Sequence, residues 1–353
     1  MLDEDSFAIS TTAPLPVLLL SDGRAGHVAL SEGIVAAVAR RREVEVRRLE
    51  VRRGRWAGHL LAALTRWPGS ARPMLTRVYG LDAFTIGPAS LVVSAGAETL
   101  AANVAAARLL GARNIFYGSL RSFRAADFSL VLTSYKTDAV APNHRMVIKP
   151  CRIDPDRLPL PAGRRDVVPA CAALLVGGDA TGIVFGPEDW ERLVTFLDAT
   201  RTAFSTRWIV SNSRRTPTAV SDRLARLASA PDGPIAEFID VRRPGAPGLS
   251  DILAKAGAVL CTADSSTMLS EAVWTRRLAL AVAPERFRLE EREAAYRRFL
   301  ADNQWTRTLP IALLTPATFR AALAQITPYA GNAQDDLAVL LAHLLPDLMR
   351  RPQ

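Results

Sequence analysis

The chain has 353 residues and a formal net charge of +9, and 49% of its residues are apolar. This length allows two domains with separate hydrophobic cores, and the composition excludes a disordered or low-complexity protein. The longest apolar runs fall short of the ~18 residues that cross a bilayer, and the acidic start does not resemble a signal peptide. We therefore expect a cytoplasmic protein that can lie at the inner face of the membrane.

The cysteines, histidines and basic residues narrow the kinds of ligand. Cys151, Cys171 and Cys261 are scattered and the four histidines form no cluster, so the sequence predicts neither a metal site nor a cofactor. The positive charge fits nucleic acid, an anionic membrane surface or phosphorylated small molecules. Because no nucleic-acid-binding motif is present, nucleic acid is not expected as a partner.

The first half of the chain alternates strands and helices. An apolar run at 17–20 predicts the first strand, the loop 21–27 follows it, and the apolar spacing predicts a helix over 28–39. The glycine spacing of this loop matches neither the dinucleotide fingerprint nor the P-loop. The alternation predicts a parallel sheet with helices on both faces. Further strands are expected at 43–51, 91–93, 114–117, 129–133 and 146–148, with a helix ending near residue 110.

Residues 40–77 form a basic stretch that also contains tryptophan. Eight Arg and three Glu lie between Arg40 and Arg55. This pattern is typical of an amphipathic segment that docks on anionic lipid. It is more typical of a helix with one side in the core and a solvated Arg side, and docking on lipid stays open as the alternative. The apolar residues at helical spacing are Trp56, Leu60, Leu61, Leu64 and Trp67.

A stretch rich in Pro, Gly and charged residues at 155–170 predicts a linker. After it the alternation of strands and helices restarts, and the tail at 315–350 is expected to be mostly helical. The strands of this half are expected at 172–176, 208–210, 235–239, 258–261 and 278–282, and the helices at 187–204, up to 228, at 249–256, from 265 or 266, and at 289–300.

Three polar loops follow predicted strands of this second half, at 177–179, 213–216 and 264–266. Because the carboxyl ends of parallel strands lie along one edge of a sheet, the loops can share one ligand. Paired glycines admit backbone N–H groups, adjacent arginines offer forked donors, and a Ser-rich helix start presents the positive end of its dipole. This chemistry suits a diphosphate, and Glu271 on that helix can accept hydrogen bonds from a ribose diol. Taken alone, the last loop also fits an ordinary capped helix.

Two of these segments resemble the signature of a known family. Ser213–Pro217 (SRRTP), followed by Thr262–Ala272 (TADSSTMLSEA), is similar to the pattern of the mitochondrial-fission, elongated-mitochondria-type family and its bacterial branch. The loop Asp22–His27 (DGRAGH) resembles that family's opening, and Ser94–Gly96 and Gly177–Gly178 also match. The resemblance implies GT-B glycosyltransferases, an α/β fold with two Rossmann-like domains whose parallel sheets face each other across a cleft.

The chain departs from the family pattern at three places. Val28–Leu30 stand where Glu-Asn-Gln is usual, Thr133–Lys136 replace Pro-Glu-His-Asp, and Arg242–Gly245 replace an Asn-Pro-Tyr loop. The donor-side signature is thus kept while the first half has changed, which leaves the acceptor and the catalytic base open.

The resemblance and the loops together give the expected domain plan. An N-terminal Rossmann-like domain at 14–154 would serve the acceptor, and a C-terminal one at 171–330 would hold a nucleotide-sugar. The linker at 155–170 would join them, and a C-terminal helix at 331–353 would pack back toward the first domain. The residues expected at the nucleotide-sugar are Gly177, Gly178, Asp179, Ser213, Arg214, Arg215, Thr216, Asp264, Ser265, Ser266, Thr267, Met268 and Glu271.

The expected function is metal-independent transfer of a sugar from a nucleotide-sugar to a cell-envelope lipid or polysaccharide. An inverting reaction needs a base from the first domain, and Asp22, His27 and Glu32 are the candidates, although a buried or helix-capping role fits His27 equally well. Gly23, Arg24, Gly26, Ser94 and Gly96 are expected on the acceptor side. The alternatives are a nucleotide-sugar epimerase or hydrolase of the same fold, and a non-catalytic adaptor at a membrane surface.

Overall fold

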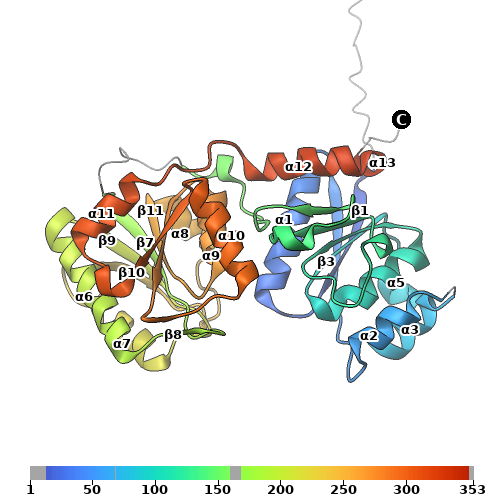
Figure 1. Cartoon of the computed structure of the whole chain (residues 1–353), viewed down its shortest axis with the longest axis horizontal. Helices are drawn as coiled ribbons and strands as arrows, with labels where there is room; N and C mark the ends of the chain where they lie inside the picture. Colours follow the sequence, from blue (N-terminus) through green and yellow to red (C-terminus); the bar gives the residue numbers. More distant parts are fainter. Residues whose placement is uncertain (1–12, 68, 160–167, 350–353) are drawn as a thin grey trace, which may run out of the picture. The chain divides into compact units, whose positions relative to one another are not determined.

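The computed structural model describes residues 13–67, 69–159 and 168–349. The chain divides into two compact units. Unit 1 comprises the chain up to Thr133, residues 139–147 and the chain from Gln334 onward, and unit 2 comprises residues 134–138 and 148–333. Each unit is an α/β layer structure built on one parallel sheet of six strands (Figure 1).

The sheet of unit 1 has the strand order β2-β1-β3-β4-β5-β6, and all neighbours are parallel. Every residue of β3 is buried, as expected for a parallel strand that has helices on both faces. The strands are β1 (Leu15–Ser21), β2 (Val44–Glu50), β3 (Leu91–Ala95), β4 (Arg113–Tyr117), β5 (Leu130–Thr133) and β6 (His144–Met146).

The helices of unit 1 cover this sheet. In α5, small residues such as Ala101, Val104 and Ala105 pack in one hydrophobic cluster with Val92 and Phe116 of the sheet. Two ion pairs attach the C-terminal helices to the unit, from Arg40 to Asp335 and from Arg113 to Asp347. The helices are α1 (Ala25–Ala39), α2 (Gly58–Leu64), α3 (Ala71–Tyr79), α4 (Ala83–Ile86), α5 (Leu100–Leu110), α12 (Ala333–Leu344) and α13 (Pro346–Met349).

The sheet of unit 2 has the order β10-β9-β7-β11-β12-β14, again with all neighbours parallel. A separate two-stranded antiparallel ribbon pairs β8 (Ile183–Val184) with β13 (Arg286–Phe287). The strands of the large sheet are β7 (Cys171–Leu175), β9 (Arg207–Ser211), β10 (Ile235–Ile239), β11 (Ala258–Thr262), β12 (Leu278–Ala283) and β14 (Thr306–Pro310).

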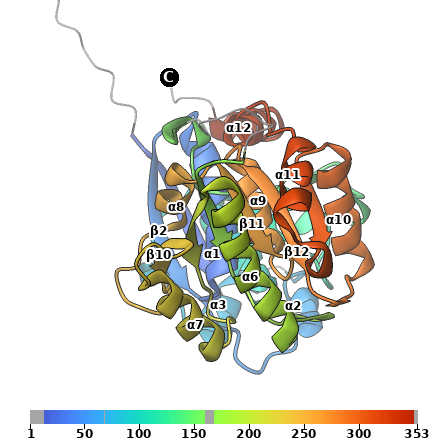
Figure 2. The same cartoon turned by 90° about the vertical axis from the view of Figure 1, so that its left-hand side faces the viewer.

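Alternate residues of these strands face opposite helix layers. Leu174, Val210 and Leu260 belong to a cluster that also contains Trp190 and Leu197 of α6, and Figure 2 shows α6 lying across that face of the sheet. The opposite face is covered by α8 and α9, which contact β7 and β11. The helices of unit 2 are α6 (Pro187–Phe204), α7 (Thr218–Ala228), α8 (Leu249–Lys255), α9 (Ser266–Trp274), α10 (Glu291–Asp302) and α11 (Pro316–Ala324).

The two parallel sheets confirm the expected α/β fold class, while several element bounds differ from the prediction. The first helix begins at Ala25, so His27 lies in its first turn. The expected helical stretch at 56–67 shortens to α2, and residues 325–332 interrupt the helical tail. Strand β14 was not predicted, because it lies at the sheet edge with only Thr306 buried and has no apolar run. Residues 160–167 of the expected linker lie outside the described residues.

Candidate functional site

Three loops meet at one edge of the unit 2 sheet. They follow β7, β9 and β11, which are neighbours in the order β9-β7-β11 and run parallel. Their carboxyl ends therefore point to the same edge, the position at which open α/β sheets bind ligands.

Two threonine hydroxyls tie the three loops together. Thr216 Oγ1 donates to the carbonyl oxygens of Val176 at 2.9 Å and Gly177 at 2.7 Å, joining the loops after β9 and β7. Thr262 Oγ1, at the end of β11, accepts from the backbone N–H of Gly177 at 2.6 Å. Both threonines are buried, so these hydrogen bonds hold the three loops together beneath the exposed surface of the edge.

An ion pair crosses from the second loop to the third. Arg215 Nη2 lies 2.6 Å from Asp264 Oδ2; the Asp264 side chain is fully buried while that of Arg215 is 45% exposed. Thr262 Oγ1 donates to the other carboxylate oxygen of Asp264 at 2.6 Å. Burial raises the pKa of Asp264, and the Thr262 hydroxyl and the Arg215 guanidinium offset part of this effect. Asp264 thus anchors Arg215 from below and leaves part of the guanidinium in solvent.

The paired glycines leave room for this arrangement. A Cβ at Gly177 would lie 2.0 Å from Asp264 Oδ2, and one at Gly178 would lie 2.1 Å from the backbone oxygen of Arg215. Neither position accepts a side chain without a shift of the loops. Glycine at both positions therefore lets the three loops approach one another.

Helix α9 starts at this edge. Ser265 is its N-cap, and the Ser265 hydroxyl accepts from the backbone N–H of Met268 at 3.3 Å. Residues 265–268 are all partly exposed. The first-turn N–H groups of Ser266 and Thr267 have no acceptor within the helix, and with the helix dipole they favour an anion in front of them.

A buried lysine contacts the same helix start. Lys149 Nζ donates a hydrogen bond to the Ser266 hydroxyl and lies 3.5 Å from Glu293 Oε2. The ring of Tyr296 lies beneath the Lys149 ammonium, with its centroid 4.9 Å away. Burial lowers the pKa of Lys149. No sequence motif pointed to Lys149, although it is one of only three lysines in the chain.

Arg297 of α10 adds a second buried cation. Its Nε donates to Glu293 Oε1 at 3.0 Å, and its Nη2 donates to the carbonyl oxygen of Ala263 at 2.7 Å. Among the described residues, Arg297 Nη1 has no hydrogen-bond partner although it is buried. Burial alone would raise the pKa of Glu293, but Lys149 and Arg297 lower it on balance. Two cations therefore face one carboxylate behind the start of α9.

The other predicted donor residues lie around this edge. Arg214 is exposed, and no carboxylate within the described ranges lies within ion-pair distance of it. Ser213 Oγ accepts from the backbone N–H of Arg215 at 3.2 Å. Asp179 stabilises the loop that follows β7, because its Oδ1 accepts a hydrogen bond from the backbone N–H of Phe185 at 3.0 Å. Glu271 is partly buried and burial raises its pKa to about 7.

In unit 1 the loop after β1 builds a His–Asp pair. His27 Nδ1 lies 2.7 Å from Asp22 Oδ2; the Asp22 side chain is 3% exposed and that of His27 is 31% exposed. When Nδ1 donates to Asp22, Nε2 is left as an acceptor. Gly96 has φ +93°, and a Cβ there would lie 2.3 Å from His27 Nδ1. Glycine at 96 therefore keeps space for the imidazole.

The remaining first-unit candidates lie in different environments. Glu32 pairs with Arg48 of β2 at 2.8 Å, so its carboxylate is engaged there. Ser94, expected on the acceptor side, is instead fully buried and accepts from Asn103 Nδ2 at 2.9 Å in the core. Gly23 has φ +76°, as the tight turn requires.

Arg24 of the loop after β1 and Gly26 in the first turn of α1 have open space around them. Arg24 is exposed, and a Cβ at Gly26 would meet nothing within 4 Å. Across residues 13–67, 69–159 and 168–349, no group of three or more His, Cys, Asp or Glu side chains gathers as a metal site.

Comparison with solved structures places the fold in the GT-B class of glycosyltransferases and epimerases. The glycotransferase of kitacinnamycin superposes with a TM-score of 0.51 and 13% identity over 96% of both chains. The UDP-GlcNAc 2-epimerase of Methanocaldococcus jannaschii gives 0.52 and 11%, over 94% of this chain and all of that one.

The sequence comparison is more specific. The model of the mitochondrial fission ELM1 family matches residues 25–331, and the chain belongs to this family. No curated protein matches the chain. The match confirms the resemblance expected from the loops after β1, β9 and β11.

Proposed function

We propose that the protein transfers a sugar from a nucleotide-sugar to an acceptor of the cell envelope, a lipid or a polysaccharide. The observation that carries the proposal is the edge formed by three interlocked loops of unit 2, where Arg215, the start of α9 and Lys149 supply positive charge to one place. The structural relatives are a glycotransferase and a UDP-GlcNAc 2-epimerase, which supports a nucleotide-sugar as the ligand.

In this proposal the diphosphate binds in front of α9. The N–H groups of Ser266 and Thr267 and the guanidinium of Arg215 are fixed donors that stabilise the charge developing on the leaving diphosphate. Arg214 offers a second exposed guanidinium on the same loop. These cations fill the role that a metal ion plays elsewhere, so we propose a reaction that needs neither metal nor cofactor.

Glu271 is proposed to bind the ribose. Its carboxylate lies on α9, partly buried, and accepts no hydrogen bond from the part of the chain that the structure describes. A carboxylate with two oxygens can accept from both hydroxyls of a ribose diol.

His27 is proposed as the general base in unit 1. Asp22 holds Nδ1, and Nε2 can then take the proton of an acceptor hydroxyl as the bond to the sugar forms. Asp22 acts through His27 as a positioning residue. Glu32, already paired with Arg48, is the weaker candidate.

Product analysis tests this proposal against the epimerase that the second structural relative favours. The full chain is incubated with a panel of nucleotide-sugars, with and without a bacterial lipid extract. The proposal expects nucleoside diphosphate and a glycosylated lipid or glycan, with turnover lost in His27→Ala and kept in Glu32→Gln. Epimerised nucleotide-sugar without acceptor would establish the epimerase instead. Binding of no nucleotide-sugar would leave the adaptor as the function.

A further inference from the structure

Four apolar residues on and beside α2 lie in solvent on unit 1, and this observation is independent of the proposed function. The helix buries Leu61 and Ala62 in the core of the unit. Leu60 and Leu64 lie four residues apart on the other side of the helix and therefore share one face. Trp56 precedes the helix and Trp67 follows it. The exposed fractions are 46% for Trp56, 50% for Leu60, 42% for Leu64 and 72% for Trp67.

The same segment is strongly basic. Residues 51–81 contain six Arg and neither Asp nor Glu. Of these, Arg52 and Arg53 pair with Glu50 and Glu98. The other four are exposed and, within the described ranges, have no carboxylate within ion-pair distance. They are Arg55, Arg66, Arg72 and Arg77.

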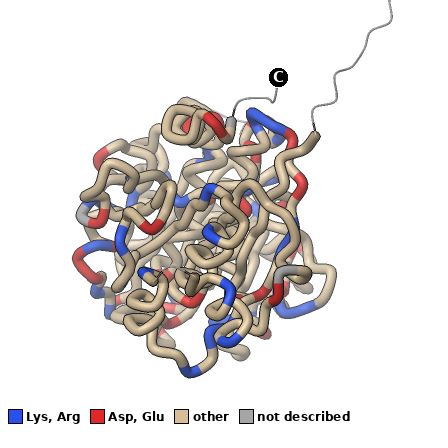
Figure 3. Tube along the Cα trace, turned by 90° about the vertical axis from the view of Figure 1, so that its right-hand side faces the viewer, with Lys and Arg blue, Asp and Glu red and all other residues tan. Residues whose placement is uncertain are grey.

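This local excess contrasts with the rest of the unit. Figure 3 shows Lys and Arg spread along the trace, with Asp and Glu between them. Residues 51–81, in contrast, contain no Asp or Glu. Exposed apolar residues flanked by unpaired cations are the composition that binds an anionic lipid surface.

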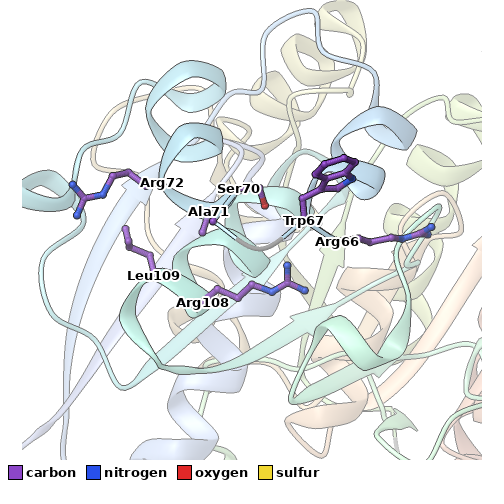
Figure 4. A pocket seen from close by; sticks show the side chains of 8 residues that line it. Arg66, Trp67, Ser70, Ala71, Arg72, Arg108 and Leu109 are labelled. Atoms are coloured by element: carbon purple, nitrogen blue, oxygen red, sulfur yellow. The ribbon is translucent and has the colours of Figure 1, made fainter.

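A cavity of about 490 Å³ opens beside these apolar residues. Figure 4 shows its lining, with Arg66 and Trp67 following α2, Ser70 and Arg72 at the start of α3, and Arg108 from α5. The guanidinium of Arg108 is partly neutralised by Asp127 at 3.3 Å. Arg66 and Arg72 thus bring unpaired positive charge to a hollow of headgroup size.

We infer that the surface formed by Trp56, Leu60, Leu64 and Trp67 docks on an anionic lipid bilayer. The two indoles and two leucines enter the interface between headgroups and acyl chains, where amphipathic rings are stable. Arg55, Arg66, Arg72 and Arg77 then contact lipid phosphates, and the cavity receives one headgroup. In residues 13–67, 69–159 and 168–349 no helix is long and apolar enough to cross a membrane.

Vesicle co-sedimentation of the full chain, without any nucleotide, tests the inference. The probes are vesicles of phosphatidylcholine alone and vesicles with phosphatidylglycerol added. The wild type is expected to bind the anionic vesicles and to release them as salt rises. Arg66→Glu/Arg72→Glu should weaken binding to anionic vesicles at least about tenfold. Trp56→Ala/Trp67→Ala should weaken it as well, through the loss of buried apolar area.

The matched control reverses two arginines of unit 2. Arg207→Glu/Arg226→Glu changes the net charge by the same amount at exposed positions and should leave vesicle binding unchanged. Equal binding of the wild type and the Arg66→Glu/Arg72→Glu variant would overturn the inference. So would equal binding to both kinds of vesicle, or a dimer in solution that Trp56→Ala/Trp67→Ala dissociates while vesicles bind neither protein. Donor binding at unit 2, measured separately, distinguishes a failure here from a failure of the proposed function.

Discussion

Arg215 and Asp264 form a half-buried ion pair, with Nη2 2.6 Å from Oδ2, although the two residues lie on loops that follow different strands. The carboxylate is sealed beneath the edge of the sheet and the guanidinium reaches solvent. An ion pair with a buried carboxylate restricts the direction of the guanidinium more than a long, unpaired side chain would allow. The pair therefore presents Arg215 to a ligand at a set position.

Replacing the anchor tests this role. Asp264→Asn removes the charge that holds Arg215 and is expected to weaken binding of a nucleoside diphosphate about tenfold, the loss of one charged hydrogen bond. Stability should change little, because a buried amide avoids the cost of a carboxylate whose pKa burial has raised. Calorimetric titration with UDP and GDP measures the affinity. Unchanged affinity would show that Arg215 binds no ligand from this position.

The glycine pair makes a prediction about stability. A Cβ at Gly178 would lie 2.1 Å from the backbone oxygen of Arg215, so Gly178→Ala is expected to lower the free energy of unfolding by about 1–3 kcal/mol. Gly26→Ala is the control, because its Cβ meets nothing within 4 Å in helix α1. That substitution should be neutral or stabilising by up to about 1 kcal/mol. Urea unfolding compares the two, and equal losses would contradict the packing described here.

Gly96 tests the His–Asp pair. Gly96→Ala places a Cβ against His27 Nδ1 and should displace the imidazole, so sugar transfer falls while donor binding at unit 2 persists. Gly111→Ala is the matched control in the same unit, since Gly111 has φ +62° and open space around its Cβ. Both variants place alanine at a positive φ, and the strain is larger at Gly96 (ψ 145°) than at Gly111 (ψ 23°). Only Gly96→Ala also disturbs His27. Equal turnover in the two variants would show that His27 has no role in sugar transfer.

Glu271 makes the stability of unit 2 depend on pH. Burial raises its pKa from 4.5 to about 7, so the folded state binds the proton more tightly than the unfolded state does. Its favourable contribution is complete below the unfolded pKa and is lost as pH rises to about 7. Glu271→Gln is therefore expected to stabilise the protein at pH 8 by up to about 3 kcal/mol and little at pH 4. Thermal unfolding at both pH values measures this, and a gain of equal size at both would contradict it.

The sequence predicted the central strands of both sheets because these strands are buried on both faces. Such strands are continuous apolar runs, as in Ala258–Thr262 and Leu278–Ala283. Parallel strands have their carboxyl ends at the same edge of a sheet. The polar loops that follow these runs therefore lie at one edge. The edge strand Thr306–Pro310 has no such run, and its pairing depends on the neighbouring β12.

Contacts between distant segments could not be predicted in this way. Lys149 and Glu293 meet Ser266 only through the fold, and no local pattern connects them. Ser94 was expected in a loop on the acceptor side, but its hydroxyl accepts a hydrogen bond from Asn103 in the core. Helix α2 is apolar on both sides, so its sequence alone did not show which side the core would cover.

The most direct measurement is a thermal-shift panel of nucleoside diphosphates and nucleotide-sugars on the wild type, Arg215→Ala and the exposed unit 2 control Arg226→Ala. A ligand at 100 times its dissociation constant stabilises a protein by about 2.7 kcal/mol. At least one nucleotide is expected to stabilise the wild type and Arg226→Ala, and Arg215→Ala is expected to lose most of the shift. Stabilisation by no nucleotide, or an undiminished shift in Arg215→Ala, would contradict a donor site at this edge.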